Sequence, residues 1–503
     1  MLDRTNLGDL VPREAPDHPL FIDLRDPSAP RRWTTAEFDH AANAVARGLL
    51  RRGFKPGDRI AVIAENRAEY LLAYFGAMRA GLVSAPVNFK LPKDTVSYIF
   101  EDAGIKAAFV DRARREFVPA GVPVFDFDDG SWDALLDPGP FDAVVPGPGQ
   151  LAKVLYTSGS TGRPKGVPLP HAGQLWALAK YFNGADEEGG GRKDLTLVVA
   201  PTYHKNGLFF SMMAISNQIA IVSLPKFEAR RYLETVAEYR CTILTGIPTM
   251  FALIARERDL LASLNLSSVR LVTIGSAPLT DALLAQVKGI FPGAVVLNGY
   301  GTTEAGPCAF GPHPRGLERP PLALGYPFMD IEWRLVDGPS AHEGAFEIKT
   351  PALMPGYLNL PDKTAERIRD GWYATGDVMR HDAEGFFYFV GRVDDMFICG
   401  GENVYPGEVE KLLERCPGVA QAAVVPVPDE IKGQIPVAFV VRTPGAMPTE
   451  QSIKDFALAN GPAYAHPRLV LFTDTIPVAS THKVDRRVLI EEATRAVRET
   501  GRR

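Results

Sequence analysis

The chain has 503 residues, of which 46% are hydrophobic and 23% are charged, and its formal net charge at pH 7 is −5. This length exceeds that of one ordinary domain, so two or more domains are expected. The mildly acidic composition gives no support for nucleic-acid binding, and no segment resembles a signal peptide or a membrane span. We therefore expect a soluble, cytoplasmic protein. Its four cysteines form no CxxC pair and are expected to be reduced thiols.

The stretch 59–298 alternates short apolar runs with longer amphipathic segments. The runs RIAVIAE (59–65) and LVSAPVN (82–88) predict strands, and AEYLLAYFGAMRAG (68–81) between them predicts a helix. Strands separated by helices are typical of a parallel sheet whose faces the helices cover. The first half of the chain is therefore predicted to have an α/β fold.

Five apolar runs end in polar loops that contain glycine or proline. The loops are TSGSTG (157–162), PTYHKNG (201–207), TGIPTM (245–250), GSAP (275–278) and NGYGTTEAG (298–306). In open α/β sheets ligands bind outside the carboxyl ends of the strands, so these loops are expected to converge on one crevice. Ordinary loop composition is the alternative, but it poorly explains the ionisable side chains of Lys165, His204 and Glu304 at strand ends.

The second half of the chain predicts a β-rich part and then a small α+β domain. Pro/Gly-rich connectors occupy 137–150 and 313–325, and alternating apolar residues follow in 332–351 and 386–397. Helices at 408–416 and 449–460 and strands at 421–428, 436–443 and 469–474 come last. The predicted fold class is α/β, with a large N-terminal domain (1–393) of parallel-sheet subdomains plus a β-rich subdomain, and a small mobile α+β C-terminal domain (394–503).

The loop TSGSTGRPKG (157–166) has the composition of a phosphate site. Glycines allow close backbone approach, and hydroxyls, free N–H groups and a lysine neutralise phosphate oxygens. A standard P-loop is excluded, because Gly162 is followed by Arg163, Pro164 and Lys165 rather than directly by Lys and Ser/Thr. Taken alone, the stretch is equally consistent with a flexible turn.

Seven motifs occur together in an order found in one known family. They are YTSGSTGRPKGV (156–167), PTYHKNG (201–207), GSAP (275–278), NGYGTTEAG (298–306), YATGD (373–377), GRVDDMFICGGENVYPGEVE (391–410) and HKVDRR (482–487). With them the chain resembles the adenylate-forming enzymes, which comprise acyl- and aryl-CoA synthetases, adenylation domains of peptide synthetases and luciferases. The resemblance runs nearly end to end.

The resemblance implies an ATP/AMP site. The residues around the phosphates would be Thr157, Ser158, Gly159, Ser160, Thr161, Gly162 and Lys165. The residues around the adenine would be Gly275, Ser276, Ala277, Pro278, Asn298, Gly299, Tyr300 and Gly301. Thr302 and Glu304 would hold the α-phosphate and Mg²⁺, Asp377 would bind the ribose hydroxyls, and Arg392 would support ribose or phosphate.

The implied catalysis is electrostatic. A carboxylate that attacks the α-phosphorus brings negative charge toward negative charge, so Mg²⁺ and lysine are needed rather than a protein nucleophile. The implied catalytic residues are Lys483, Glu304, Thr302, Lys165 and His204. Lys483 would contact both the substrate carboxylate and the α-phosphate, although HKVDRR considered alone favours a solvated lysine. His482 stands where the family often has glycine.

The resemblance also implies an acyl pocket formed by His204, Gly207, Met250, Phe251, Gly275, Tyr300 and Gly306. Lys205 either meets a distal polar group of the substrate or turns into solvent, and solvent is favoured because lysines are seldom buried unpaired. The small domain would rotate about Asp394 between two half-reactions, and Gly400, Gly401 and Glu402 would then bind CoA.

The function implied by this resemblance is that of an acid–CoA ligase that uses ATP, Mg²⁺ and CoA. Its carboxylic acid would be aromatic or a medium- or long-chain fatty acid. An enzyme that loads a carrier protein and a non-catalytic nucleotide-binding regulator remain the alternatives. Whether the protein forms a homodimer stays open.

Overall fold

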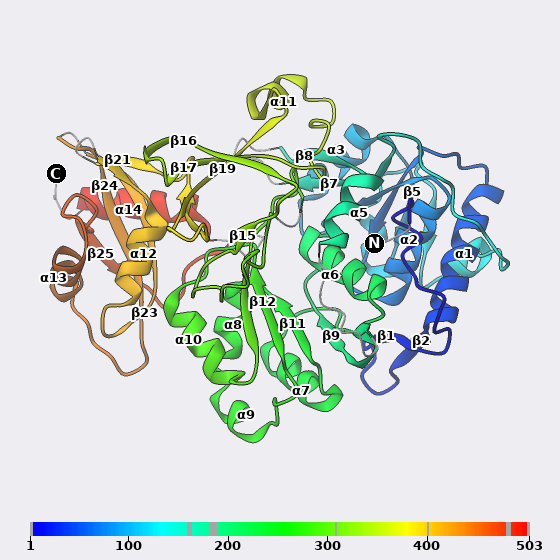
Figure 1. Cartoon of the computed structure of the whole chain (residues 1–503), viewed down its shortest axis with the longest axis horizontal. Helices are drawn as coiled ribbons and strands as arrows, with labels where there is room; N and C mark the ends of the chain where they lie inside the picture. Colours follow the sequence, from blue (N-terminus) through cyan, green and yellow to red (C-terminus); the bar gives the residue numbers. More distant parts are fainter. Residues whose placement is uncertain are drawn as a thin grey trace.

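A computed structural model describes residues 4–157, 163–180, 190–306, 309–399, 402–429, 431–478 and 484–499. Figure 1 shows two α/β units at the right and bottom, antiparallel strands above the centre, and the C-terminal part at the left. This arrangement has the predicted fold class: parallel-sheet units, a β-rich part and a C-terminal α+β part.

The first sheet has six strands in the order β6-β5-β3-β4-β7-β8. They are β3 (Arg59–Ile63), β4 (Val83–Pro86), β5 (Ile105–Val110), β6 (Val124–Asp126), β7 (Leu151–Thr157) and β8 (Lys165–Pro170). All neighbouring pairs are parallel except β7 and β8, which form an antiparallel hairpin. Helix α2 (Ala68–Arg79) connects β3 to β4, so the strand–helix–strand prediction for residues 59–88 is confirmed.

The second sheet has seven strands in the order β13-β12-β11-β9-β10-β1-β2. They are β1 (Pro19–Asp23), β2 (Arg31–Thr34), β9 (Leu195–Val198), β10 (Ala220–Ser223), β11 (Ile243–Gly246), β12 (Leu271–Gly275) and β13 (Val295–Gly299). Only the β1–β2 pair is antiparallel. An N-terminal strand therefore completes a sheet whose other parallel strands come from residues 195–299.

Helices pack against both sheets. They are α1 (Thr35–Arg51), α2 (Ala68–Arg79), α3 (Lys93–Ala103), α4 (Ser131–Leu135), α5 (His171–Ala179), α6 (Lys205–Ser216), α7 (Ala229–Tyr239), α8 (Pro248–Ile254), α9 (Arg258–Ser263) and α10 (Asp281–Ile290). A capping box between Thr34 and Glu37 begins α1. Every residue of α2 is buried, because this helix packs against strands of both sheets and against α1.

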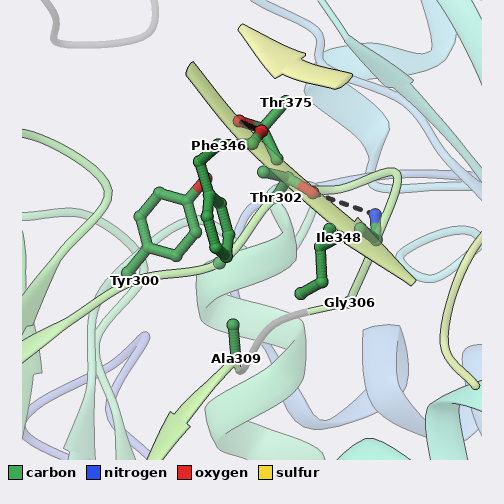
Figure 2. Close-up of a pocket in the computed structure, with 9 residues that line it drawn as sticks. Tyr300, Thr302, Gly306, Ala309, Phe346, Ile348 and Thr375 are labelled. Atoms are coloured by element: carbon green, nitrogen blue, oxygen red, sulfur yellow. Dashed lines mark hydrogen bonds between the residues drawn. The ribbon is translucent and has the colours of Figure 1, made fainter. Parts of the chain in front are cut away.

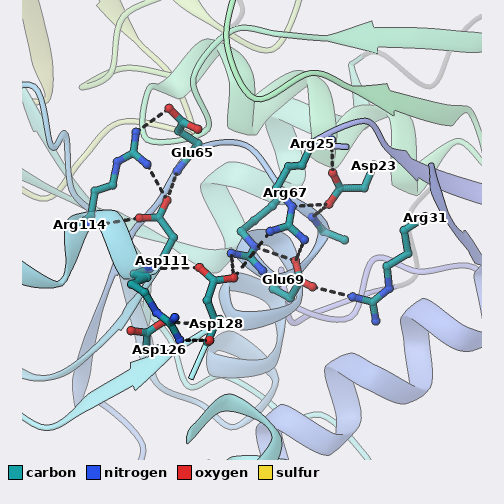
Figure 3. A network of polar contacts seen from close by, with 12 residues as sticks. Asp23, Arg25, Arg31, Glu65, Arg67, Glu69, Asp111, Arg114, Asp126 and Asp128 are labelled. Atoms are coloured by element: carbon teal, nitrogen blue, oxygen red, sulfur yellow. Dashed lines mark hydrogen bonds and ion pairs between the residues drawn. The ribbon is translucent and has the colours of Figure 1, made fainter. Parts of the chain in front are cut away.

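A polar network also joins the two sheets where β1 meets α2 (Figure 3). The Arg67 guanidinium bonds Glu69 at 2.8 Å and Asp128 at 2.9 Å, and the backbone N–H of Ala68 donates to Asp23 of β1. Arg67 and Glu69 are both nearly inaccessible to solvent, so each needs the other's charge. The network holds the edge of one sheet against the helix that covers the other.

The β-rich part is an antiparallel sheet of β16 (Glu332–Ser340), β17 (Glu343–Lys349), β18 (Ile368–Arg369), β19 (Trp372–His381) and β20 (Phe387–Arg392). The short pair β14 (Phe310–Gly311) and β15 (Tyr326–Pro327) precedes it, and α11 (Pro361–Arg367) lies between β17 and β18. The sheet brings the YATGD motif, on β19, beside the GR of GRVDD, at the end of β20.

The C-terminal part has a sheet of β21 (Phe397–Cys399), β22 (Glu402–Val404), β23 (Val419–Asp429), β24 (Gly433–Arg442) and β25 (Leu469–Phe472). Its helices are α12 (Pro406–Glu414), α13 (Glu450–Asn460) and α14 (Arg486–Glu499), of which α14 had no sequence prediction. Helix α12 packs against the preceding part of the chain, where the Lys411 ammonium donates to the Phe389 carbonyl at 3.2 Å. None of the helices in the described ranges is long and apolar enough to cross a membrane.

Candidate active site

Four of the predicted loops converge because their strands are neighbours in one sheet. Strands β13, β12, β11 and β9 lie in that order and are parallel, so their carboxyl ends share one edge. The Asn206 side chain, after β9, donates to the Ser276 hydroxyl, after β12, at 3.3 Å. This hydrogen bond spans the loop of β11 and ties the edge together.

The fifth loop reaches the site by another route. Strand β7 belongs to the six-stranded sheet and pairs antiparallel with β8, where Thr157 lies opposite Lys165. The position of Lys165, the first residue of β8, supports the prediction that this loop converges with the others, because the charge of Glu304 acts on the Lys165 ammonium. Ser158, Gly159, Ser160, Thr161 and Gly162 lie outside the described residues, and Thr157 ends β7.

Lys165, Tyr357 and Glu304 form the charged centre of the site. The Lys165 ammonium lies 4.4 Å from the centre of the Tyr357 ring, and the Tyr357 hydroxyl donates to Glu304 Oε1 at 3.1 Å. Burial lowers the pKa of Lys165, an effect that the charge of Glu304 opposes and that of Arg367 reinforces. A cation and a carboxylate thus contact the same tyrosine.

Asp377, Tyr300 and Arg392 form a second polar group beside it. Asp377 is 4% exposed and accepts hydrogen bonds from Arg392 at 2.8 Å and from the Tyr300 hydroxyl at 2.5 Å. The register of β19 against β20 sets Asp377 directly opposite Arg392. Burial, followed by the charge of Asp377, raises the pKa of Tyr300, so this phenol stays a proton donor. These two hydrogen bonds hold the carboxylate in one orientation.

A small pocket lies between residues 300–306 and strands β17 and β19 of the β-rich sheet (Figure 2). Its lining residues are Tyr300, Gly301, Thr302, Ala305, Gly306, Ala309, Phe346, Ile348 and Thr375. The Thr302 N–H donates to the Gly306 carbonyl at 3.0 Å, and the Thr302 hydroxyl accepts from the Ala305 N–H at 2.9 Å. Gly306 has a φ of 100°, and a Cβ there would lie 2.7 Å from that of Ala352. The loop conformation therefore depends on this glycine.

The strand ends that are predicted to line the adenine are also closely packed. A Cβ on Gly275 would lie 2.8 Å from the Gly299 carbonyl oxygen, so only glycine lets the two strand ends meet. Asn298 anchors the next loop by donating to the Leu322 carbonyl at 2.7 Å. Ser276 has a φ of 68°, and the chain bends at Ser276 and Ala277 directly after β12 ends.

The predicted acyl residues are buried to different degrees. His204 is half-buried, precedes α6, and its ring lies 4.6 Å from that of Tyr203. Phe251 has no solvent exposure, Met250 is 8% exposed, and both belong to the same core of the second sheet. The solvated alternative for Lys205 is wrong, because its Nζ atom is buried.

The residues predicted for domain movement and CoA are described only in part. Asp394 lies in the turn between β20 and β21, with its carboxylate 3.4 Å from Arg367 and 3.6 Å from Arg392. Glu402 begins β22. Gly400, Gly401 and Lys483 fall outside the described residues.

Sequence reasoning missed three residues at the site. Tyr357 follows the turn MPG, Arg367 ends α11, and Thr375 was quoted within YATGD without a role; its hydroxyl accepts from the Asp377 N–H at 3.0 Å. A tyrosine between a Pro-Gly turn and a polar stretch carries little signal by itself. Only the fold shows that it bridges Lys165 and Glu304.

Comparison with known proteins agrees with this geometry. The model of the family "AMP-binding enzyme" matches residues 10–358, and that of the "AMP-binding enzyme C-terminal domain" matches residues 408–483. The chain belongs to the AMP-binding enzyme family.

Relatives of this AMP-binding enzyme are ligases that act on acids. The fatty acid–[acyl-carrier-protein] ligase ScoC of Streptomyces coeruleorubidus is 31% identical over 91% of each chain. The feruloyl-CoA synthase of an Amycolatopsis species is 32% identical over 90% of this chain and 92% of its own. The crystal structure of the anthranilate CoA ligase AuaEII with anthranoyl-AMP is 25% identical, covers 98% of each chain and superposes with a TM-score of 0.86.

Proposed function

We propose that this AMP-binding enzyme is an AMP-forming acid–CoA ligase. A carboxylic acid and ATP give acyl-AMP and pyrophosphate, and acyl-AMP and CoA then give acyl-CoA, AMP and a proton. The observation that carries the proposal is the single site in which the Lys165–Tyr357–Glu304 group lies beside the Asp377–Tyr300–Arg392 group. Full-length similarity to acid ligases, one of them with a bound acyl-adenylate, supports it.

The nucleotide would be held at both of its ends. Asp377 accepts hydrogen bonds from Tyr300 and Arg392, which orient its carboxylate, and the ribose hydroxyls would donate to the same carboxylate. Lys165 would neutralise phosphate oxygens, and a bound anion would oppose the effect of burial, which lowers the pKa of Lys165.

The donors at Glu304 fit Mg²⁺. This cation prefers oxygen ligands and is commonly held by one or two carboxylates together with substrate phosphates and water. Glu304 uses Oε1 as an acceptor from Tyr357 and has further lone pairs, and the Thr302 hydroxyl is two residues away. Bound Mg²⁺ would supply positive charge at the phosphates as the carboxylate attacks.

The C-terminal part would complete each half-reaction in turn. Lys483 would neutralise the attacking carboxylate during adenylation, and rotation about Asp394 would bring Gly400, Gly401 and Glu402 to the thiol. These assignments rest on the motifs GRVDD, ICGGENV and HKVDRR and remain part of the proposal.

A carrier protein is the second candidate acceptor, because ScoC transfers its fatty acid to an acyl-carrier protein. The test is AMP release with ATP and Mg²⁺ across benzoates, cinnamates, dicarboxylates and fatty acids of graded length. Each acid is assayed without acceptor, with CoA and with a phosphopantetheinylated carrier protein. Turnover that depends on CoA supports the proposal, turnover only with the carrier moves the acceptor, and silence with every acid favours a regulator.

The Lys483→Ala variant provides the internal control for the two-step scheme. It is expected to lose most acyl-AMP formation and still to convert preformed acyl-AMP and CoA to thioester. Adenylation at the wild-type rate would overturn the role of Lys483. A cytoplasmic location and a homodimeric state remain proposals from the sequence, which cell fractionation and light scattering of the purified protein would test.

A further inference from the structure

Two histidines from different segments meet at one end of the β-rich sheet. His342 lies in the short turn between β16 and β17, and His381 is the last residue of β19. The His381 N–H donates to the His342 carbonyl at 2.9 Å, and the centres of the two rings are 4.8 Å apart. Backbone pairing therefore fixes the two imidazoles beside each other, although they are 39 positions apart in the sequence.

The contact between the rings sets a nitrogen lone pair of one toward a nitrogen of the other. His381 Nδ1 lies 3.0 Å from the Asp382 carbonyl oxygen, which can only accept, so in the neutral ring Nδ1 carries the proton and Nε2 keeps its lone pair. This Nε2 atom lies 3.3 Å from His342 Nδ1. Histidines that bind metal ions are commonly oriented in this way, with one ring nitrogen donating to a backbone carbonyl and the other facing the ion.

The spacing of the two nitrogens fits a shared metal ion. Zinc–nitrogen bonds of about 2.0–2.1 Å at a tetrahedral angle place two ligand nitrogens about 3.3–3.4 Å apart. The separation between His342 and His381 is 3.3 Å, which is long for a direct hydrogen bond. Imidazole nitrogens suit zinc, copper and nickel, whereas magnesium prefers oxygen ligands. The pair therefore has the chemistry of a transition-metal site.

The pair is accessible to ions and is packed against aromatic rings. His342 is exposed and His381 is half-buried. The His381 ring lies 5.6 Å from the ring of Trp333 and 5.4 Å from that of Phe387, which restricts its rotation. No third His, Cys, Asp or Glu joins the two histidines in a group of three among the described residues, so water would fill the remaining coordination positions.

We propose that His342 and His381 together bind a divalent transition-metal ion of the Cu²⁺, Ni²⁺ and Zn²⁺ class, through His342 Nδ1 and His381 Nε2. The ion would link the turn before β17 to the end of β19 and stabilise this end of the sheet. His381 lies four positions beyond Asp377 on β19, about 13 Å along the strand. The site is therefore separate from the proposed nucleotide site, and the inference does not rest on the proposed function.

The test is a titration of the full-length protein with Cu²⁺, Ni²⁺ and Zn²⁺, followed by isothermal titration calorimetry and by tryptophan fluorescence. Cu²⁺ is expected to bind more tightly than Ni²⁺ or Zn²⁺, which is the usual order for nitrogen ligands. Cu²⁺ is also expected to quench the fluorescence of Trp333, because this ring lies beside His381. Trp333→Phe should remove that part of the signal and keep the binding seen by calorimetry.

Variants of the two ligands identify the site. His342→Gln and His381→Gln are each expected to weaken Cu²⁺ binding by about 10-fold or more, because loss of even an outer partner of a ligand weakens metal affinity by about 10- to 100-fold. His40→Gln, which removes an exposed histidine of α1, is the matched control and keeps the affinity. Glu304→Gln, at the proposed magnesium site, also keeps it.

Three results would overturn the inference. Unchanged Cu²⁺ binding in both histidine variants would place the ion elsewhere. Weaker binding in only one of them would make a single imidazole the ligand rather than the pair. If the wild-type protein binds none of the three ions, the contact is only a hydrogen bond between two rings. None of these measurements uses acid activation, so a failure of the proposed ligase function is distinguishable from a failure of this inference.

Discussion

Replacing Lys153 by methionine is expected to stabilise the protein at neutral pH. Lys153 lies on β7, is 1% exposed, and its ammonium is 6.0 Å from the centre of the Tyr74 ring. Burial lowers its pKa from 10.5 to about 7. The nearby His171 also stays neutral, since burial and the charge of Lys153 lower its pKa to about 4.

The size and sign of the effect follow from that pKa. Below pH 10.5 the lysine is protonated in the unfolded chain but stays neutral in the folded protein, and this difference destabilises the folded state. The loss of folding free energy grows as pH falls from 10.5 to about 7 and is constant below about pH 7. At about 1.4 kcal/mol per pKa unit, the full cost is about 5 kcal/mol. Between about pH 9 and about pH 7 it rises by about 2 kcal/mol.

The measurement is urea unfolding of both proteins at these two pH values, followed by tryptophan fluorescence. Trp132 reports on the relevant region because it lies in the same core as Tyr74. The stability difference between variant and wild type should shrink by about 2 kcal/mol on going from about pH 7 to about pH 9. Contributions of the methionine that do not depend on pH cancel in this comparison.

Lys106→Met removes an exposed lysine from strand β5 of the same sheet, and the pH dependence of its effect on stability is the background to subtract. A difference for Lys153→Met that is constant across the pH range would refute the reasoning. It would mean that Lys153 is charged in the folded protein and that an interaction offsets its burial.

Three further predictions concern the site and α12. Glu304→Gln keeps the size of the side chain but removes its charge, so adenylation should fall about 100-fold, with a raised Mg²⁺ requirement in pyrophosphate release. Burial raises the pKa of Glu414 to about 7, although hydrogen bonds from Ala422 and Thr280 lower it in part. The buried carboxyl therefore destabilises the folded protein increasingly as pH rises above 4.5, where the unfolded side chain ionises. Glu414→Gln should therefore stabilise the protein by about 2 kcal/mol more at about pH 8 than at about pH 5, as measured by urea unfolding. Asp394→Pro should keep adenylation and slow thioester formation in separate half-reaction assays.

Each of these predictions has a contrary outcome. Full adenylation by Glu304→Gln would remove this carboxylate from the proposed metal site. If the effect of Glu414→Gln on the free energy of unfolding does not change with pH, Glu414 is ionised in the folded protein.

The parallel strands around the site were predictable because their pattern is local. Each of β9, β11, β12 and β13 is a short apolar run, and the last three end at glycine. Strands β11, β12 and β13 are consecutive in sequence and adjacent in the sheet, whereas β9 lies beside β11 although β10 comes between them in sequence. Glu304 and Asp377 were identifiable because the motifs around them occur in a fixed order.

The other features depend on contacts between distant segments. The hairpin of β7 and β8 lies in a different sheet from the strands that precede the other predicted loops, which no property of TSGSTG indicates. Tyr357 acquires its role only because the chain after β17 passes over Lys165. Lys205 was expected in solvent on residue type alone, and tertiary packing of α6 overrides that preference.

The proposed hinge and the proposed nucleotide site share side chains, and this decides how Asp394 must be tested. The Asp394 carboxylate contacts Arg392, which bonds Asp377, and Arg367, whose charge lowers the pKa of Lys165. Asp394→Pro removes this carboxylate as well as restricting φ, so on its own it confounds two effects. Asp394→Ala removes only the carboxylate. If the backbone is the hinge, the alanine variant should keep both half-reactions and the proline variant should lose the second alone. Equal slowing of thioester formation in both variants would assign the effect to the ion pairs, and equal loss of adenylation would assign it to the nucleotide site.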